Sequence, residues 1–331
     1  MHTPFATTLR LFLPLALVAG LSAPAALAAE KTVRVALGDI ETVETLNLLI
    51  ALEKAKERGV AVELTAFKSE DIAAQAVVGG QADIGVGTPY ALLQKVKAPI
   101  RIFYQLSTLR FFPMVDASRY KSWKDLDGQE IVVHSRGSGT EAIMNLMAQR
   151  NGIKYKSVSY VPGSEVRAGA MLQGNIHATI VDSANRRLLM EKGGDRFMVL
   201  PMEGVDASDE ALYANQEFLT SNAEAVDILV EELLTVWRAI NKDPNYVLEQ
   251  RAKYKLLPDL PADLEGEVLP YFQESVENGA FGNNGGLEAA QDDFDFYSIA
   301  GQLEGDPAAL KVEDFWDLGP LGTALRKLGQ V

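Results

Sequence analysis

Short apolar segments rich in β-branched residues alternate with stretches of helical periodicity from Thr32 to about Val199. The short segments are typical of buried strands, and the alternation is typical of βαβ units with a mainly parallel sheet. Strands are predicted at 32–37, 60–67, 82–86, 100–106, 130–134, 157–161 and 178–181. Helices are predicted at 43–58, 70–78, 140–151, 165–172 and 184–192, and Ser69 and Pro89 have the residue types that begin helices.

Two segments depart from this alternation. Residues 110–116 have an extended pattern but contain Pro113, which favours an edge strand or a crossover over a central strand. Residues 198–201 have the pattern of a return crossover. From Ala223 onward the pattern changes to long amphipathic helices, and their apolar stripe predicts core packing because an exposed stripe would be a costly apolar patch.

Residues 80–88 (GQADIGVGT) and 174–182 (GNIHATIVD) share one arrangement. Each runs from a glycine that ends a helix, through a short strand, to a polar residue that caps the next helix. Two lobes of like topology would place Thr88 and Asp182 at corresponding strand ends. Because ligands of open α/β sheets bind beyond the carboxyl ends of the strands, a cleft between facing strand ends is predicted.

The N-terminal residues 1–28 have the pattern of a cleaved secretory signal peptide. Arg10 precedes the apolar stretch 11–21, and small residues stand at Ala26 and Ala28. A helix needs about 20 residues to cross a bilayer, so this stretch is too short for a membrane anchor. Export to the periplasm is the expectation.

Composition narrows the classes of partner. The 331 residues include no cysteine, so an exported chain must rely on a packed core and not on disulfides. The formal net charge is −14, from 31 basic and 45 acidic residues. Such a balance argues against nucleic acid or an anionic membrane surface as a partner.

Four motifs follow one another in an order that resembles the type II periplasmic-binding fold. They are the Gly38-Asp39 loop, the segment 79–85 (GGQADIG), the turn 135–140 (SRGSGT) and the segment 172–178 (LQGNIHA). Within that fold the chain is similar to the family that serves ABC transporters of nitrate, sulfonates, taurine and pyrimidine precursors.

The resemblance implies an α/β protein of two lobes, residues 30–112 plus 205–331 and residues 113–204, joined by two crossover segments with a ligand cleft between them. It further implies a monomeric solute-binding protein. Such a protein captures a small polar or anionic organic molecule, for example a sulfonate or carboxylate, and delivers it to the membrane permease of an ABC transporter.

Residues 136–140 have the composition of an anion-binding turn. Glycines let the backbone approach a ligand closely, and the first N–H groups of the next helix are unpaired at the positive end of its dipole. In the family the matching segment touches the ligand, which implies contacts from Arg136, Ser138, Gly139 and Thr140. The alternative is an ordinary capped helix after a tight turn.

Thr88, Pro89 and Tyr90 hold the equivalent position in the first lobe. Thr88 either caps the helix or contacts the ligand, and Tyr90 is expected to form a pocket wall. Ser107 and Arg110 follow the predicted strand 100–106. The guanidinium of Arg110 suits bidentate pairing with a carboxylate or sulfonate, and its alternative is an exposed salt bridge at the hinge.

Asp39 and Asp182 also stand at strand ends that face the predicted cleft. Carboxylates there favour a cationic or hydrogen-bond-donating group, so a zwitterionic ligand also fits the sequence. Asp182 has a helix cap as its alternative role.

Motifs of catalysis are missing from the sequence. Ser138 lacks the glycine two residues earlier that a nucleophile elbow requires, because Arg136 stands there, and no Walker A motif occurs. His134 and His177 have no recognisable metal partner in the sequence. The chain is therefore expected to have no catalytic residue, metal or cofactor, while an exported ligand sensor and an enzyme of the same fold are the alternatives to a transport protein.

Overall fold

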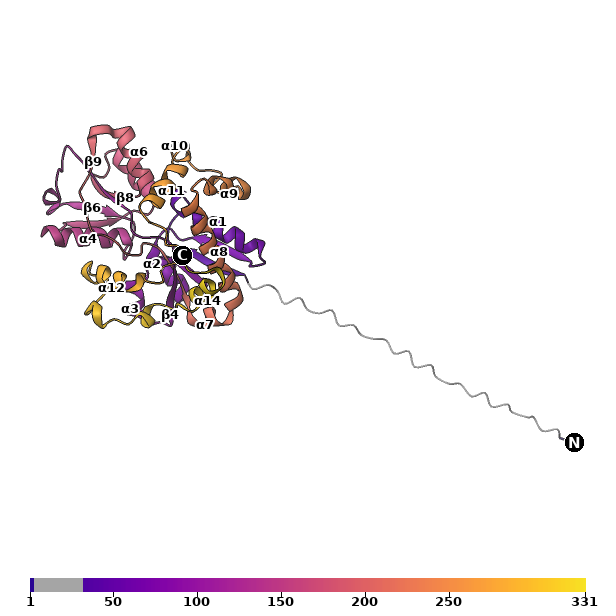
Figure 1. The fold of residues 1–331 in the computed structure, drawn as a ribbon. Coiled ribbons are helices and arrows are strands. Elements are labelled where there is room, and N and C mark those ends of the chain that lie inside the picture. The colour runs from indigo at the N-terminus through magenta and orange to yellow at the C-terminus, as the bar shows by residue number, and fades with distance from the viewer. Residues whose placement is uncertain (3–31) are drawn as a thin grey trace. The chain divides into compact units, whose positions relative to one another are not determined.

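The computed structural model describes residues 1–2 and 32–331, so the predicted signal peptide lies almost wholly outside the described residues. Residues 32–331 lie within one compact unit. Two five-stranded sheets with helices around them make up this unit (Figure 1).

The first sheet has the strand order β2-β1-β3-β10-β4. Its strands are β1 (Val33–Leu37), β2 (Val62–Ala66), β3 (Ile84–Gly87), β4 (Ile100–Gln105) and β10 (Ala211–Asn215). Strand β1 is parallel to β2 and β3, whereas β10 is antiparallel to β3 and β4.

The second sheet has the order β7-β6-β8-β5-β9. Its strands are β5 (Phe112–Asp116), β6 (Glu130–Val133), β7 (Ser157–Tyr160), β8 (Ala178–Val181) and β9 (Phe197–Val199). Strand β6 is parallel to β7 and β8, and β5 is antiparallel to β8 and β9. Both sheets thus have the same pattern, with the antiparallel strand in the fourth place.

Helices connect the strands and form most of the chain after β10. They are α1 (Leu46–Glu57), α2 (Glu70–Val78), α3 (Tyr90–Val96), α4 (Gly139–Asn151), α5 (Ser164–Leu172), α6 (Ser183–Gly193), α7 (Gln216–Ser221), α8 (Ala223–Lys242), α9 (Tyr246–Tyr254), α10 (Ala262–Glu265), α11 (Val268–Glu277), α12 (Ala289–Ile299), α13 (Val312–Phe315) and α14 (Gly319–Leu328), with the short 3-10 helices η1 (Val43–Thr45), η2 (Trp123–Leu126), η3 (Gly194–Arg196) and η4 (Pro307–Ala309). Within the described part of the chain, none of the helices has the length and apolar character needed to cross a membrane.

The apolar stripe predicted after Ala223 lies in the core. Leu233, Val236, Trp237 and Ile240 of α8 have no exposed surface. Helix α8 packs against α1 and α14 beside the first sheet (Figure 1). The prediction of core packing is confirmed.

Three local predictions need correction. Strand β10 was not predicted; it runs antiparallel to the other four described strands of the first sheet, as β5 does in the second, and both sheets are otherwise parallel, as expected. Pro113 lies in β5, which has a neighbour on each side and is not an edge strand. Its carbonyl oxygen accepts a 2.8 Å hydrogen bond from the N–H of Leu200, so its nitrogen faces the same side, just beyond the end of β9. No backbone donor is needed at that point, so proline is tolerated there. Ser69 precedes α2, but its hydroxyl donates to Asp71 and does not cap the helix.

Candidate functional site

The loops that follow β1 and β6 meet between the two sheets. His134, the first residue after β6, has its Nε2 atom 3.0 Å from the carbonyl oxygen of Gly38, the first residue after β1. One residue further along, Ser135 Oγ accepts a 3.3 Å hydrogen bond from the backbone N–H of Glu70. Corresponding strand ends therefore face each other, which is where open α/β sheets bind ligands.

Two small cavities lie at this meeting place. The central cavity is narrow, with about 10 Å³ of room for the centre of a water molecule, and is lined by Asp39, Glu44, Glu70, Phe111, His134, Thr140, Ser164, Arg167, Asp209 and Glu210. The side cavity has about 20 Å³ of such room and is lined by Glu44, Ser107, Thr108, Arg110, Phe112, Ser183, Asp209, Tyr271, Glu274, Ser275, Asn278 and Ala280. Because the cavities share Glu44 and Asp209, we treat them together as the interlobe site.

Carboxylates dominate the central cavity. Asp39 follows β1, Glu70 is the first residue of α2, and Asp209 and Glu210 immediately precede β10. Glu70 accepts a hydrogen bond from the backbone N–H of Thr88 at 2.5 Å. Within residues 32–331, no hydrogen bond or ion pair engages the carboxylates of Glu44, Asp209 or Glu210.

The pKa values of these acids respond to their surroundings. Burial raises the pKa of Glu44 well above its usual range, and the charges of Asp182, Asp209 and Asp39 add to the effect. Burial also raises the pKa values of Asp209 and Glu210 well above the usual range, followed by repulsion from neighbouring acids. Burial and the neighbouring acids both disfavour the ionised forms, and no hydrogen bond from the described residues reaches these carboxylates to oppose them.

Arg167 of α5 supplies a positive charge to the central cavity. Its side chain is 1% exposed and donates to the carbonyl oxygens of Ile180 at 3.1 Å and Val161 at 2.9 Å and to Ser164 Oγ at 3.1 Å. Burial lowers the pKa of Arg167, and the negative charges of Asp39 and Asp182 oppose this effect. The guanidinium therefore offsets part of the acidic charge while its donors hold α5 to the strand ends.

The predicted anion-binding turn is closed by its own hydrogen bonds. Ser138 Oγ donates to the carbonyl oxygen of Ser135 at 2.8 Å and accepts from the N–H of Glu141 at 3.3 Å. Thr140 Oγ1 accepts from the N–H of His134 at 3.1 Å, and Thr140 lines the central cavity. The capped-helix alternative thus describes Ser138.

The residues at the start of α3 are also engaged within the protein. Thr88 Oγ1 donates to the carbonyl oxygen of Asp209 at 2.6 Å, and Pro89 is buried at the position that precedes the helix. Tyr90 is 1% exposed; its hydroxyl donates to Asp293 and accepts from Trp316 Nε1 at 2.8 Å. Tyr90 therefore lies in the aromatic core and not in a pocket wall.

Arg110 and Arg136, the two arginines expected to bind an anion, are not positioned to do so. Arg110 lines the side cavity beside Ser107, but its guanidinium donates to the carbonyl oxygens of Leu109 and Asn278 at 2.8 and 3.1 Å. It also pairs with the exposed Asp206 at 3.4 Å, so the salt-bridge alternative describes it. Arg136 is exposed, and its guanidinium carbon lies 5.3 Å from the centre of the Tyr160 ring. Neither guanidinium points a free bidentate edge at the central cavity.

Of the two predicted carboxylates, Asp39 lines the central cavity and Asp182 does not. Asp182 accepts from the N–H of Asn185 at 2.8 Å and from its Nδ2 at 2.9 Å, so it caps α6. The expectation that Thr88, Gly139 and Asp182 would themselves line one gap needs correction. Thr88 and Gly139 both contact Asp209, and Ser183, next to Asp182, lines the side cavity.

Several site residues escaped the sequence reasoning. Glu44 and Glu70 lie in or at the start of helical segments, and Arg167 lies inside α5. A charged residue in a helix is usually exposed to solvent, so the sequence gives no sign that these three face a cavity. Asp209 and Glu210 precede the one strand that was not predicted. The one sign of these two acids in the sequence is that they directly precede a short apolar segment, as residues at a strand end do.

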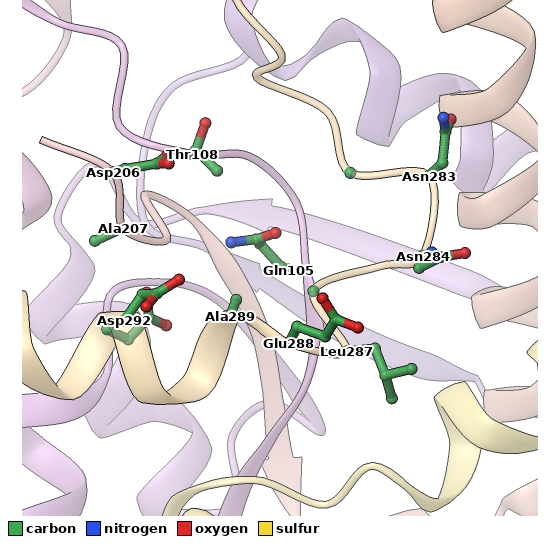
Figure 2. Close-up of a pocket in the computed structure, with 13 residues that line it drawn as sticks. Gln105, Thr108, Asp206, Ala207, Asn283, Asn284, Leu287, Glu288, Ala289 and Asp292 are labelled. Carbon is green, nitrogen blue, oxygen red and sulfur yellow. The ribbon is translucent and has the colours of Figure 1, made fainter. Parts of the chain in front are cut away.

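A wider pocket of about 260 Å³ lies outside the interlobe site (Figure 2). Figure 2 shows Gln105 in its middle, between the loop of Asn283 and Asn284 and the segments that carry Thr108 and Asp206. Gln105 Nε2 donates to Ser208 Oγ at 2.8 Å. No residue of the second sheet or its helices lines this pocket among the described residues, so it does not join the two lobes.

Comparison with solved structures gives the fold. A protein of Bordetella bronchiseptica RB50 superposes with a TM-score of 0.73 at 21% identity, over 90% of this chain and 98% of that one. The nitrate-binding protein NrtA from Synechocystis PCC 6803 gives 0.68 at 14% identity, over 90% and 89%. The alkanesulfonate-binding protein SsuA from Xanthomonas axonopodis pv. citri gives 0.65 at 16%, over 87% and 99%. The predicted fold, two α/β lobes of the periplasmic-binding type, is confirmed.

Comparison of sequences gives the family. No curated protein matches the chain significantly. A family model described as NMT1/THI5 like matches residues 44–246, which is more than half of the 331 residues and includes Glu44, Glu70, Arg167, Asp209 and Glu210. The chain therefore belongs to the NMT1/THI5-like family.

Proposed function

We propose that this protein is the solute-binding component of an ABC importer. After export to the periplasm it captures a small polar molecule in the interlobe site and delivers it to the membrane permease, as a monomer and without chemical change to the cargo. The supporting observation is a cavity between two lobes in which Glu44, Asp209 and Glu210 receive no hydrogen bond from the protein. Buried polar groups are almost always satisfied, so a molecule that supplies the donors fits this place.

The lobes of the proposed clamp are residues 30–112 plus 205–331 and residues 113–204. Contacts between segments outside the sheets favour a closed arrangement: His134 Nε2 lies 3.0 Å from the carbonyl oxygen of Gly38, and Gln302 Nε2 donates to the carbonyl oxygen of Ser138 at 3.0 Å. Closure around a cargo by a hinge at two crossover segments is a common mode of binding in two-domain proteins. The solved relatives described as nitrate-binding and alkanesulfonate-binding proteins support the solute-binding role.

The anionic cargo expected from the turn 135–140 has less support than a polar cargo in general. Ser138 caps α4, and the guanidinium of Arg110 binds backbone carbonyls. Carboxylates outnumber arginines around the central cavity. A sulfonate or carboxylate would therefore meet repulsion from Glu44, Asp209 and Glu210 unless these acids were protonated.

The test is recovery of the natural cargo. The full chain, with its N-terminal segment, is expressed in a Gram-negative host and purified from the periplasmic fraction. Mass spectrometry of the small molecules released on denaturation should identify one dominant compound that rebinds unchanged with 1:1 stoichiometry. Conversion of that compound on incubation would favour an enzyme. If no compound is released and none rebinds, the solute-binding role is refuted.

A further inference from the structure

The interlobe site has a large excess of acidic groups. Its carboxylates are Asp39, Glu44, Glu70, Asp209, Glu210 and Glu274, whereas its arginines are Arg110 and Arg167. Glu274 is paired with Arg186 and Arg187, which approach it from α6. The guanidiniums of Arg110 and Arg167 donate to backbone carbonyls and lie beside the acids without direct pairing. Little of the acidic charge is thus compensated within the protein.

Three of these acids lack any partner in the described part of the chain. Asp209 is 6% exposed and lines both cavities, while Glu44, which lines both, and Glu210, which lines the central one, are half-buried. Burying a carboxylate without hydrogen-bond donors costs several kcal/mol in general, and such groups are rare in proteins. Three carboxylates without such donors in one site favour a ligand that carries positive charge and hydrogen-bond donors.

An uncharged group at the same place points to a ligand independently. Ser183, the first residue of α6, is 5% exposed, and its hydroxyl has no hydrogen-bond partner in the structure. It lines the side cavity together with Glu44 and Asp209. Thr108 lines the same cavity, and its buried Oγ1 also lacks a partner. The unsatisfied polar atoms of the two lobes therefore face one space.

We propose that the ligand carries a cationic group with N–H donors, such as a primary ammonium, an amidinium or a guanidinium, held by Glu44, Asp209 and Glu210. This inference rests on the proposed solute-binding function. The acceptors are carboxylate oxygens that need hydrogen-bond donors, so an N–H-bearing cation fits better than a quaternary ammonium, which would offer none. Phe111, Phe112 and Tyr271 line the same cavities and suit a short apolar body beside the charge.

A metal ion does not fit the same acids. The described residues contain no group of three or more histidine, cysteine, aspartate or glutamate side chains arranged to hold a metal. The carboxylates are spread along two adjoining narrow cavities and do not surround one point. A molecule with separated N–H donors matches this spacing better than a single ion.

The experiment uses the full chain purified from the periplasm, unfolded and refolded to remove any cargo. Calorimetry at pH 7.5 measures binding of butane-1,4-diamine, n-butylguanidine, tetramethylammonium, propane-1-sulfonate and butanoate. We expect the diamine or the guanidine to bind and the two anions not to bind. Glu44→Gln and Glu210→Gln should each weaken that binding roughly 10- to 100-fold, because each removes a charge-assisted hydrogen bond. The control Glu249→Gln, on the exposed side of α9, changes the net charge equally and should have no effect.

The outcomes separate this inference from the proposed function. Binding of an anion that Glu44→Gln leaves unchanged or strengthens would overturn the cationic ligand, while the solute-binding role would stand. If no probe binds, the compound released from the periplasmic preparation decides, since an N–H-bearing cation supports the inference and any anion or uncharged compound overturns it. If no probe binds and no compound is released, both proposals fail. Unchanged melting curves of the two glutamine variants exclude misfolding, and Glu210→Gln serves alone if Glu44→Gln does not fold.

Discussion

The carboxylate oxygen Oδ1 of Asp209 lies 2.7 Å from the position that a β-carbon on Gly139 would occupy. Gly139 is the first residue of α4, where the helix dipole and unpaired N–H groups favour a negative charge. The sequence predicts a ligand anion at this helix start, but in the structure the side chain of Asp209 lies beside Gly139, without a hydrogen bond to its carboxylate from the described residues. The same relationship explains why a residue without a side chain stands at position 139.

Gly139→Ala should destabilise the protein by about 1–3 kcal/mol, because the added methyl group meets Asp209 Oδ1 and also Leu109 Cδ2 at 2.5 Å. Urea unfolding measures the loss. Gly169→Ala is the matched control, since Gly169 lies inside α5 with no atom within 4 Å of its added β-carbon. That variant should be neutral or up to about 1 kcal/mol more stable. Equal effects of both substitutions would contradict the close contact at Gly139.

The sequence predicts the parallel strands well because their apolar, β-branched residues are local signals. Strand β8 and helix α2 have the predicted bounds. Strand β10 (Ala211–Asn215) has no β-branched residue, and it is a strand because β3 and β4, distant in sequence, pair with it on both sides. Only tertiary context reveals such a strand.

The site is less predictable than the fold. Among the predicted residues, Asp39 and Thr140 line the central cavity, and Ser107 and Arg110 line the side cavity. Polar residues at strand ends are visible in the sequence, but whether they cap a helix or face a cavity depends on neighbours. A buried arginine such as Arg167 has the same local pattern as an exposed helix residue, because its burial comes from the strand ends that it contacts.

Removing both arginines of the predicted anion site should leave ligand affinity within about threefold of the wild type. Arg110 donates to the carbonyl oxygen of Asn278, and Arg136 stacks near Tyr160. Arg110→Ala should lower stability by about 1 kcal/mol through lost hydrogen bonds, and Arg136→Ala by less. Calorimetry of the double variant with the released cargo checks the affinity. A loss of about a hundredfold or more would instead show that an arginine holds the ligand.

Ion pairs between α6 and α11 should stabilise closure of the two lobes. Arg187 Nε lies 2.6 Å from Glu267 Oε2, and Arg187 also pairs with Glu274. Arg187→Met keeps most of the side-chain volume but removes these pairs. Partly buried ion pairs of this kind contribute about 1 kcal/mol, so the variant should bind the cargo roughly fivefold more weakly, and the wild-type advantage should shrink at high salt.

The chain has no cysteine, so spin labels can report the distance between the lobes directly. Labels at Lys121→Cys and Glu249→Cys lie on exposed positions of the second and first lobes. Without cargo, Arg187→Met should broaden the distance distribution toward longer values. Arg251→Met is the control, because Arg251 pairs with Glu265 between α9 and α10 of the same lobe. A similar change in both variants would mean that the α6–α11 pairs do not govern closure.

Asp293 links the segment before β10 to the aromatic core and has no exposed surface. Its Oδ1 accepts from the N–H of Ser208 at 2.6 Å, and its Oδ2 accepts from the hydroxyl of Tyr90 at 2.5 Å. Burial raises the pKa of Asp293 to about 6, although these two hydrogen bonds lower it. The folded protein therefore holds this proton more tightly than the unfolded chain, in which the pKa is about 4.

The contribution of Asp293 to stability should be greatest below about pH 4 and should disappear as the pH rises through about 6. A difference of about two pKa units corresponds to about 3 kcal/mol across this window. Asp293→Asn cannot titrate, so relative to the wild type its free energy of unfolding should rise by about that amount from pH 4 to pH 7. Other buried acids titrate in both proteins, which makes the difference between the two curves the informative quantity.

Urea unfolding at half-unit pH intervals measures both curves. Asp295→Asn, on the exposed side of the same helix, is the control and should run parallel to the wild type. A difference between Asp293→Asn and the wild type that stays constant from pH 4 to pH 7 would show that Asp293 does not titrate in this window. Its hydrogen bonds to Ser208 and Tyr90 would then outweigh the effect of burial, and the carboxylate would be ionised throughout.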